Sequence, residues 1–200
     1  MVAALAISVP ASHAAKTQLQ TGPTLASHDF AQSAQGWLIW GDSATVDPIF
    51  HSSGGNPGGY IASHDEALGE TWYFRAPGTV VRQLPAAEDG TISFSLKQSA
   101  AAAGFPEDDI VIVGTAGRIS YRFGFAPGTA WTGFSVRLSE HEGWRWNWGA
   151  RATQAQIRSV LTSAVSLDIR GEYLTGPDVG SLDNFVLSAA PVQSTSTPGT

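Results

Sequence analysis

The chain has 200 residues, of which 42% are hydrophobic and only 14% charged, and it contains 22 glycines and 11 prolines. This composition is typical of one β-rich, turn-rich globular domain and excludes a helical bundle or a disordered chain. The formal charge of −6, without a basic cluster, argues against nucleic acid and anionic membranes as partners, and the absence of cysteine excludes disulfides and cysteine-based zinc sites.

The N-terminal residues predict export from the cytoplasm. Residues 2–9 are apolar, and Ser12 and Ala14 place small residues before a cleavage point after position 14. We interpret residues 1–14 as a partial secretory signal peptide, with a disordered Ala-rich N-terminus as the alternative. We therefore expect a secreted or extracellular protein, the periplasm and the cell surface being included. No stretch reaches the ~18 apolar residues of a membrane-spanning helix.

Residues 15–27 are polar and predict a linker before the folded domain. The segment 54–59 (Gly-Gly-Asn-Pro-Gly-Gly) cannot form regular structure, and we name it the Gly/Pro loop. It leads into an apolar run at Tyr60 and Ile61, then Asp65, then a second run over residues 72–76 that stops at a proline. The order is turn, strand, acidic turn, strand, stop.

Hydrophobic residues alternate with polar ones in three later segments, which predicts half-buried antiparallel strands. The alternating apolar positions are Ile92, Phe94 and Leu96; Ile119, Tyr121 and Phe123; and Phe134, Val136 and Leu138. Residues 110–113 are continuously apolar, so we expect a strand buried on both faces. Residues 167–169 and 182–187 predict further strands.

One helix is expected. Thr153 and Gln156 have the spacing of a capping box, and apolar residues follow at helical spacing over residues 157–164. Nine to eleven short strands with one helix predict an all-β fold, an antiparallel β-sandwich of the jelly-roll kind. We assign residues 28–189 to this domain and residues 190–200 to a flexible tail.

Several segments, in this order, resemble the laminin IV type A domain, also called laminin B, in its bacterial secreted members. The resemblance spans about residues 28–188 and rests on Gly36-Trp37, Gly58-Gly59-Tyr60-Ile61, Trp72-Tyr73-Phe74-Arg75-Ala76-Pro77 and the segments 90–96, 109–114, 131–138 and 167–173. It implies a galactose-binding-like β-sandwich, an extracellular setting and no catalysis.

Calcium is the cofactor that the sequence suggests. Jelly-roll modules often hold Ca²⁺ where the first strand meets the last, through carboxylates and backbone carbonyls. Asp29 and Asp183 are expected to be neighbours there, and Asp42, Asp65 and Glu172 could complete the site. The alternative is that these carboxylates cap turns and strand ends by accepting hydrogen bonds from nearby backbone.

The run Trp144-Arg145-Trp146-Asn147-Trp148 is the candidate ligand site. Three indoles at a period of two point to one side of a strand, where they would form a platform for sugar rings. The alternative is that they cover a sandwich edge, since large aromatic residues usually serve packing.

The sequence shows no nucleophile motif, phosphate loop or catalytic metal spacing. We therefore predict a non-catalytic extracellular module that binds a glycan or a protein surface. The alternatives are a structural scaffold without a ligand and a glycan-active enzyme; a cleft holding a carboxylate pair with raised pKa values would favour the enzyme.

Overall fold

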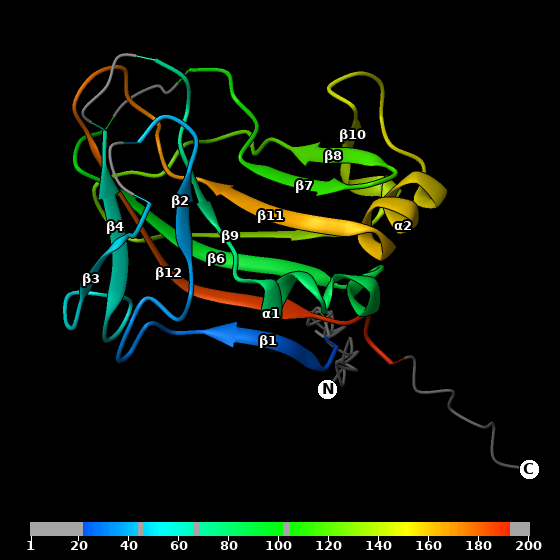
Figure 1. Ribbon diagram of the computed structural model, residues 1–200, viewed down its shortest axis with the longest axis horizontal. Coiled ribbons are helices and arrows are strands. Elements are labelled where there is room, and N and C mark those ends of the chain that lie inside the picture. Colours follow the sequence, from blue (N-terminus) through cyan, green and yellow to red (C-terminus); the bar gives the residue numbers. More distant parts are fainter. Residues whose placement is uncertain (1–21, 44–45, 66–68, 102–104, 193–200) are drawn as a thin grey trace, which may run out of the picture.

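The computed structural model describes residues 22–43, 46–65, 69–101, 105–192 and shows two antiparallel sheets packed face to face (Figure 1). Sheet A contains β1 (Thr24–His28), β3 (Ile49–His51), β4 (Tyr60–His64), β6 (Thr91–Gln98), β9 (Thr132–Arg137) and β12 (Val179–Ser188). Sheet B contains β2 (Leu38–Trp40), β5 (Tyr73–Arg75), β7 (Ile110–Gly114), β8 (Gly117–Tyr121), β10 (Arg145–Trp146) and β11 (Ala164–Arg170). The predicted all-β sandwich is confirmed.

The core lies between the two sheets and is built from the predicted alternation. Ile92, Phe94 and Leu96 of β6 face inward, as do Ile110 and Ile112 of β7, and each is at most 2% exposed. Strands with an apolar face are stable only when that face is covered, so burial of the inner faces of β6 and β7 drives the sheets together. None of the described helices is long and apolar enough to cross a membrane.

Strand β12 connects the parts of sheet A. It pairs with β6 on one side; on the other side its first half pairs with β4 and its second half with β1. Between the halves the register shifts, and Asn184 has a φ of 51°. The Gly/Pro loop covers this break, because the buried Asp183 carboxylate accepts a hydrogen bond from the Asn56 backbone N–H at 2.5 Å.

Helix α2 (Gln154–Thr162) is the predicted helix, and its capping box is present: Thr153 and Gln156 exchange side-chain and backbone hydrogen bonds. Its buried face packs beside β7 and β8 at one end of the sandwich (Figure 1). Shorter turns occur at α1 (Gly78–Val81), η1 (Leu84–Ala87) and η2 (Glu140–Glu142).

Two details of the prediction were wrong. Strand β1 begins inside the segment 15–27 that was predicted as a linker and ends at His28. Its Leu25 and Ala26 pack against the core, so the domain begins before residue 28. The run 110–113 is buried on one face only, since Val111 and Val113 point away from the core. The predicted signal peptide (1–14) and most of the predicted tail lie outside the described residues.

Candidate functional site

A groove of about 470 Å³ crosses the outer face of sheet B. Its floor is formed by side chains from the central strands of the sheet, namely Tyr73, Arg75, Val111, Val113, Ser166 and Asp168. Trp40 of edge strand β2 and Trp148, which follows edge strand β10, also line it. The two edge strands are five strand spacings apart, roughly 24 Å at the usual separation in a sheet. The groove therefore has the reach of an extended ligand.

Strand register explains why these side chains share one face. Val111 pairs with Asp168, and Asp168 pairs with Arg75 across three adjacent strands. Successive residues of a strand point to opposite faces, so the residues between these positions enter the core while this row lines the groove. The apolar Val111 and Val113 then lie beside charged side chains, which gives the groove a floor of mixed character.

At one end of the groove, Trp40 is 56% exposed, and the Arg75 guanidinium lies 3.8 Å from the centre of its ring. Arg75 is also held by both oxygens of Asp168, at 2.7 and 3.1 Å, and the Ser166 hydroxyl donates to the same carboxylate. A cation stacked on an indole and paired with a carboxylate has little freedom to move. This end of the groove is therefore rigid and nearly neutral.

At the other end of the groove an arginine again stacks on a tryptophan, but this arginine has no ion pair with a carboxylate among the described residues. Trp148 is 57% exposed, and the Arg118 guanidinium lies 3.2 Å from the centre of an indole ring. Asn147 fixes the start of β8, because its side-chain oxygen accepts a hydrogen bond from the Arg118 backbone N–H at 3.0 Å. The groove thus has a Trp–Arg pair at each end.

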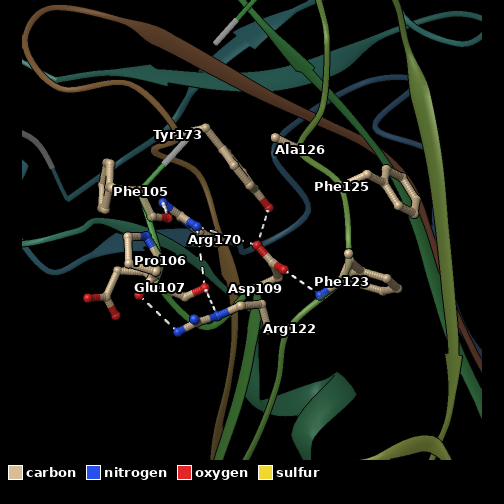
Figure 2. Close-up of a pocket in the computed structure, with 11 residues that line it drawn as sticks. Phe105, Pro106, Glu107, Asp109, Arg122, Phe123, Phe125, Ala126, Arg170 and Tyr173 are labelled. Carbon is tan, nitrogen blue, oxygen red and sulfur yellow. Dashed lines mark hydrogen bonds and ion pairs between the residues drawn. The ribbon is translucent and has the colours of Figure 1, made fainter. Parts of the chain in front are cut away.

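Two further hollows adjoin the groove. Trp40 and Glu70 also line an open depression of about 670 Å³ with Asp42 and Val46, so a long ligand could continue past Trp40. Glu107 is shared with a cavity of about 270 Å³ at the end of sheet B (Figure 2).

The polar groups at the base of the Figure 2 cavity satisfy one another. Tyr173 donates to Asp109 at 2.8 Å, and the other oxygen of Asp109 accepts the Phe123 N–H at 2.7 Å. Arg170 lies 3.6 Å from Asp109 and donates to the Glu172 carbonyl oxygen at 2.6 Å. Burial raises the pKa of Asp109. Because these groups are nearly fully buried and already partnered, we interpret them as a structural network.

The predicted tryptophan platform is not formed by its three members. Trp144 is fully buried and donates to the Arg137 carbonyl oxygen at 2.7 Å, while Trp146 packs over Gly117. Strand β10 has only two residues, and Asn147 and Trp148 follow with φ values of 46° and 59°. This turn ends the two-residue periodicity, so Trp148 alone of the three reaches the groove.

The five carboxylates predicted for calcium lie in three places. Asp29 and Asp183 are near enough for the charge of Asp29 to raise the pKa of Asp183, although burial is the main cause. Asp65 and Glu172 lie together with Asp178 inside the protein, and Asp42 borders the depression beside Trp40. Among the described residues, no three acidic or histidine side chains are arranged to hold a metal ion.

Calcium binding at Asp29 and Asp183 stays a prediction. The two Asp183 oxygens accept backbone N–H groups of Asn56 and Asn184, at 2.5 and 2.7 Å, so these contacts would have to be exchanged for the ion. Calcium bound to the folded state would raise the melting temperature, and the rise would grow with the logarithm of the calcium concentration above the Kd. Thermal melting in millimolar Ca²⁺ against EDTA tests this, with Asp183→Asn as the variant that should lose any shift.

Glu172 and Asp178 are the acids with the most strongly raised pKa values. Burial, followed by the charge of Asp65, raises the pKa of Glu172 to about 7, and burial raises that of Asp178 to about 6. Both are at most 6% exposed and neither lines the groove or its two adjoining hollows. This pair therefore does not meet the condition for an enzyme stated above, a carboxylate pair in a cleft.

Sequence reasoning did not find Trp40, Arg75 or Arg118 as groove residues. Two signals were present: Trp40 alternates with the inward Ile39, and Arg118 occupies a polar position of an alternating strand. The apolar run 110–113 was a third signal. A strand that is apolar on both faces can be buried on both sides, but it can also have an outer face that lines a groove.

Solved structures share this fold. The L4b domain of human laminin alpha-2 matches with a TM-score of 0.63 and 14% identity, over 84% of this chain and 99% of that domain. A family 11 carbohydrate-binding module from Clostridium thermocellum, in complex with a β-1,3-1,4-mixed-linked tetrasaccharide, matches with a TM-score of 0.53 and 17% identity, over 87% and 99%. The family 11 carbohydrate-binding module of the cellulosomal cellulase Lic26A-Cel5E of Clostridium thermocellum matches with a TM-score of 0.52 and 16% identity, over 87% and 98%.

No curated protein matches the chain significantly. The family comparison agrees with the resemblance seen in the sequence: the model described as Laminin B (Domain IV) matches residues 73–200, which include eight of the twelve strands. This chain belongs to the laminin B (domain IV) family.

Proposed function

We propose that this protein is a non-catalytic, extracellular module that binds a glycan chain in the groove on the outer face of sheet B. The observation that carries the proposal is the pair of half-exposed tryptophans at opposite ends of one groove with a polar floor. Large exposed aromatic residues in a concave surface are uncommon without a partner, and indoles stack on the apolar faces of sugar rings.

The polar groups on the floor of the groove also support glycan binding. Arginine and aspartate side chains and the Ser166 hydroxyl supply both donors and acceptors, which is what the many hydroxyl groups of a sugar require. Solved relatives of this fold include carbohydrate-binding modules, one of them with a bound tetrasaccharide. The laminin membership supports an extracellular setting.

Replacing Trp40 or Trp148 by alanine should weaken glycan binding by about tenfold or more, since an aromatic contact at a binding site typically contributes more than 1 kcal/mol. The measurement is a screen on immobilised polysaccharides followed by calorimetry with the glycan that binds. Ile49→Ala is the control, because Ile49 is 44% exposed on strand β3 of sheet A and lines neither the groove nor the two hollows beside it.

The second candidate is a scaffold module without a ligand, which the laminin relative favours. Absence of binding to every glycan on a broad array, by a protein shown to be folded, would support the scaffold and refute the glycan module. Binding that survives both tryptophan substitutions would refute the assignment to this groove.

A further inference from the structure

The arginines on the outer side of sheet B differ in how their charges are compensated. Six are found there, on β5, β8, β10 and β11 or next to them: Arg75, Arg118, Arg122, Arg145, Arg151 and Arg170. Four lie within ion-pair distance of an aspartate. Arg75 is 2.7 Å from Asp168, Arg170 is 3.6 Å from Asp109, and Asp108 is shared by Arg122 at 3.5 Å and Arg145 at 3.7 Å.

Of the other two, Arg151 is exposed and does not line the groove, whereas Arg118 does. Within the described parts of the chain, the Arg118 guanidinium makes no ion pair and no hydrogen bond, and its close contact is the Trp148 ring at 3.2 Å. Burial lowers its pKa, so the group has lost water without gaining a carboxylate, while Asp108 acts on it only from a distance. A partly desolvated cation without an anionic partner, lining a groove, is favourably placed to accept one from a ligand.

We propose that the Arg118–Trp148 end of the groove binds the carboxylate of a sugar acid, so that the ligand is a glycan containing uronic acid. This inference rests on the proposed glycan-binding function. The planar guanidinium can hold the two oxygens of a carboxylate side by side. Stacking on Trp148 fixes its orientation before the ligand arrives, which reduces the entropy lost on binding.

The rest of the groove limits how many acidic groups the ligand carries. Arg75 is already neutralised by both oxygens of Asp168, and Glu70 and Glu107 add negative charge elsewhere in the lining. The whole chain has a formal charge of −6. A uniformly charged polyanion would be repelled by these groups, so the ligand places its uronic acid at the Arg118 end and neutral sugars along the floor.

The test compares polysaccharides that contain uronic acid with their own carboxyl-reduced forms, which keep the same linkages but lack the charge. Neutral and sulfated polysaccharides are included as further probes. We expect at least one acidic polysaccharide to bind the full chain and to lose tenfold or more in affinity on carboxyl reduction. Arg118→Gln should abolish this difference, and Arg118→Lys should keep part of it.

Arg82→Gln is the matched control, because it removes one positive charge from an exposed residue that does not line the groove. The melting temperature of Arg118→Gln should stay close to that of the wild type, since Arg118 loses no ion pair and only its stacking on the exposed Trp148 ring. Absence of any glycan binding would refute the proposed function itself. Equal binding of acidic and reduced forms, an effect of Arg82→Gln as large as that of Arg118→Gln, or an Arg118-dependent preference for sulfated probes would refute the carboxylate site and leave glycan binding intact.

Discussion

Replacing Gly171 by alanine should destabilise the protein by more than about 3 kcal/mol, a large part of the roughly 5–15 kcal/mol by which ordinary domains are stable. A Cβ at this position would lie 1.8 Å from a ring carbon of Trp72 and within 2.4 Å of two more. Trp72 is fully buried, and its ring packs edge-on against Phe74 at 5.0 Å between centroids. The indole cannot move aside without displacing the neighbouring core.

Urea unfolding followed by tryptophan fluorescence measures this effect. Gly133→Ala is the control, because Gly133 is an exposed strand residue whose added Cβ would meet no atom within 4 Å. It should change the free energy of unfolding by less than about 0.5 kcal/mol. Combining Gly171→Ala with Trp72→Leu should recover part of the loss, since the two substitutions act on one contact. A Gly171→Ala variant as stable as the wild type would show that this packing is wrong.

The sequence was sufficient for the architecture because the signals for it are local. Alternation at Ile92, Phe94 and Leu96 identifies a strand and its buried face, and Thr153 with Gln156 identifies where a helix begins. Neither signal depends on which strands become neighbours. Strand β1 was missed because its short polar sequence is ordered by pairing with β12, which lies about 160 residues away in the chain.

The site was harder to predict because it depends on strand order and on one turn. Trp40 and Trp148 share a groove only because β2 and β10 are the two edges of the same sheet. The indoles at 144, 146 and 148 have the spacing of a platform, but the positive φ values of Asn147 and Trp148 redirect the last of them. Such a turn has no strong sequence signature when neither residue is glycine.

The grouping of the carboxylates was also not predictable from the sequence, because it depends on strand pairing. Asp65 and Glu172 were predicted to help bind a metal with Asp29 and Asp183, since acidic residues near strand ends are typical ligands. In the fold they are instead grouped with Asp178, whose backbone carbonyl oxygen accepts the Asp65 N–H at 3.1 Å. Pairing of β4 with β12 creates this contact, and no local sequence pattern predicts that these two strands pair.

This buried group should make the protein more stable at pH 5 than at pH 8. Glu172 has a pKa of about 7 in the folded state against 4.5 for the free side chain, and Asp178 about 6 against 3.8. Between about pH 4 and pH 7 the folded state binds more protons than the unfolded state, so stability falls as pH rises through that range. Glu172 and Asp178 lie close enough to titrate as a coupled pair, and we expect a total loss on the order of 3 kcal/mol.

Glu172→Gln provides the decisive comparison, because an amide cannot ionise but keeps an oxygen for the Trp72 backbone N–H, which donates to Glu172 at 3.3 Å. The variant should lose most of the pH dependence and should be more stable than the wild type at pH 8, where the wild type must keep a charged carboxylate beside Asp65. Glu88→Gln is the control, since hydrogen bonding to Arg158 lowers the pKa of Glu88 and gives it the opposite, weak dependence on pH. Urea unfolding across this pH range measures both. A wild type that is equally stable at pH 5 and pH 8, or a Glu172→Gln variant with an unchanged slope, would show that these carboxylates are not held protonated in the folded state.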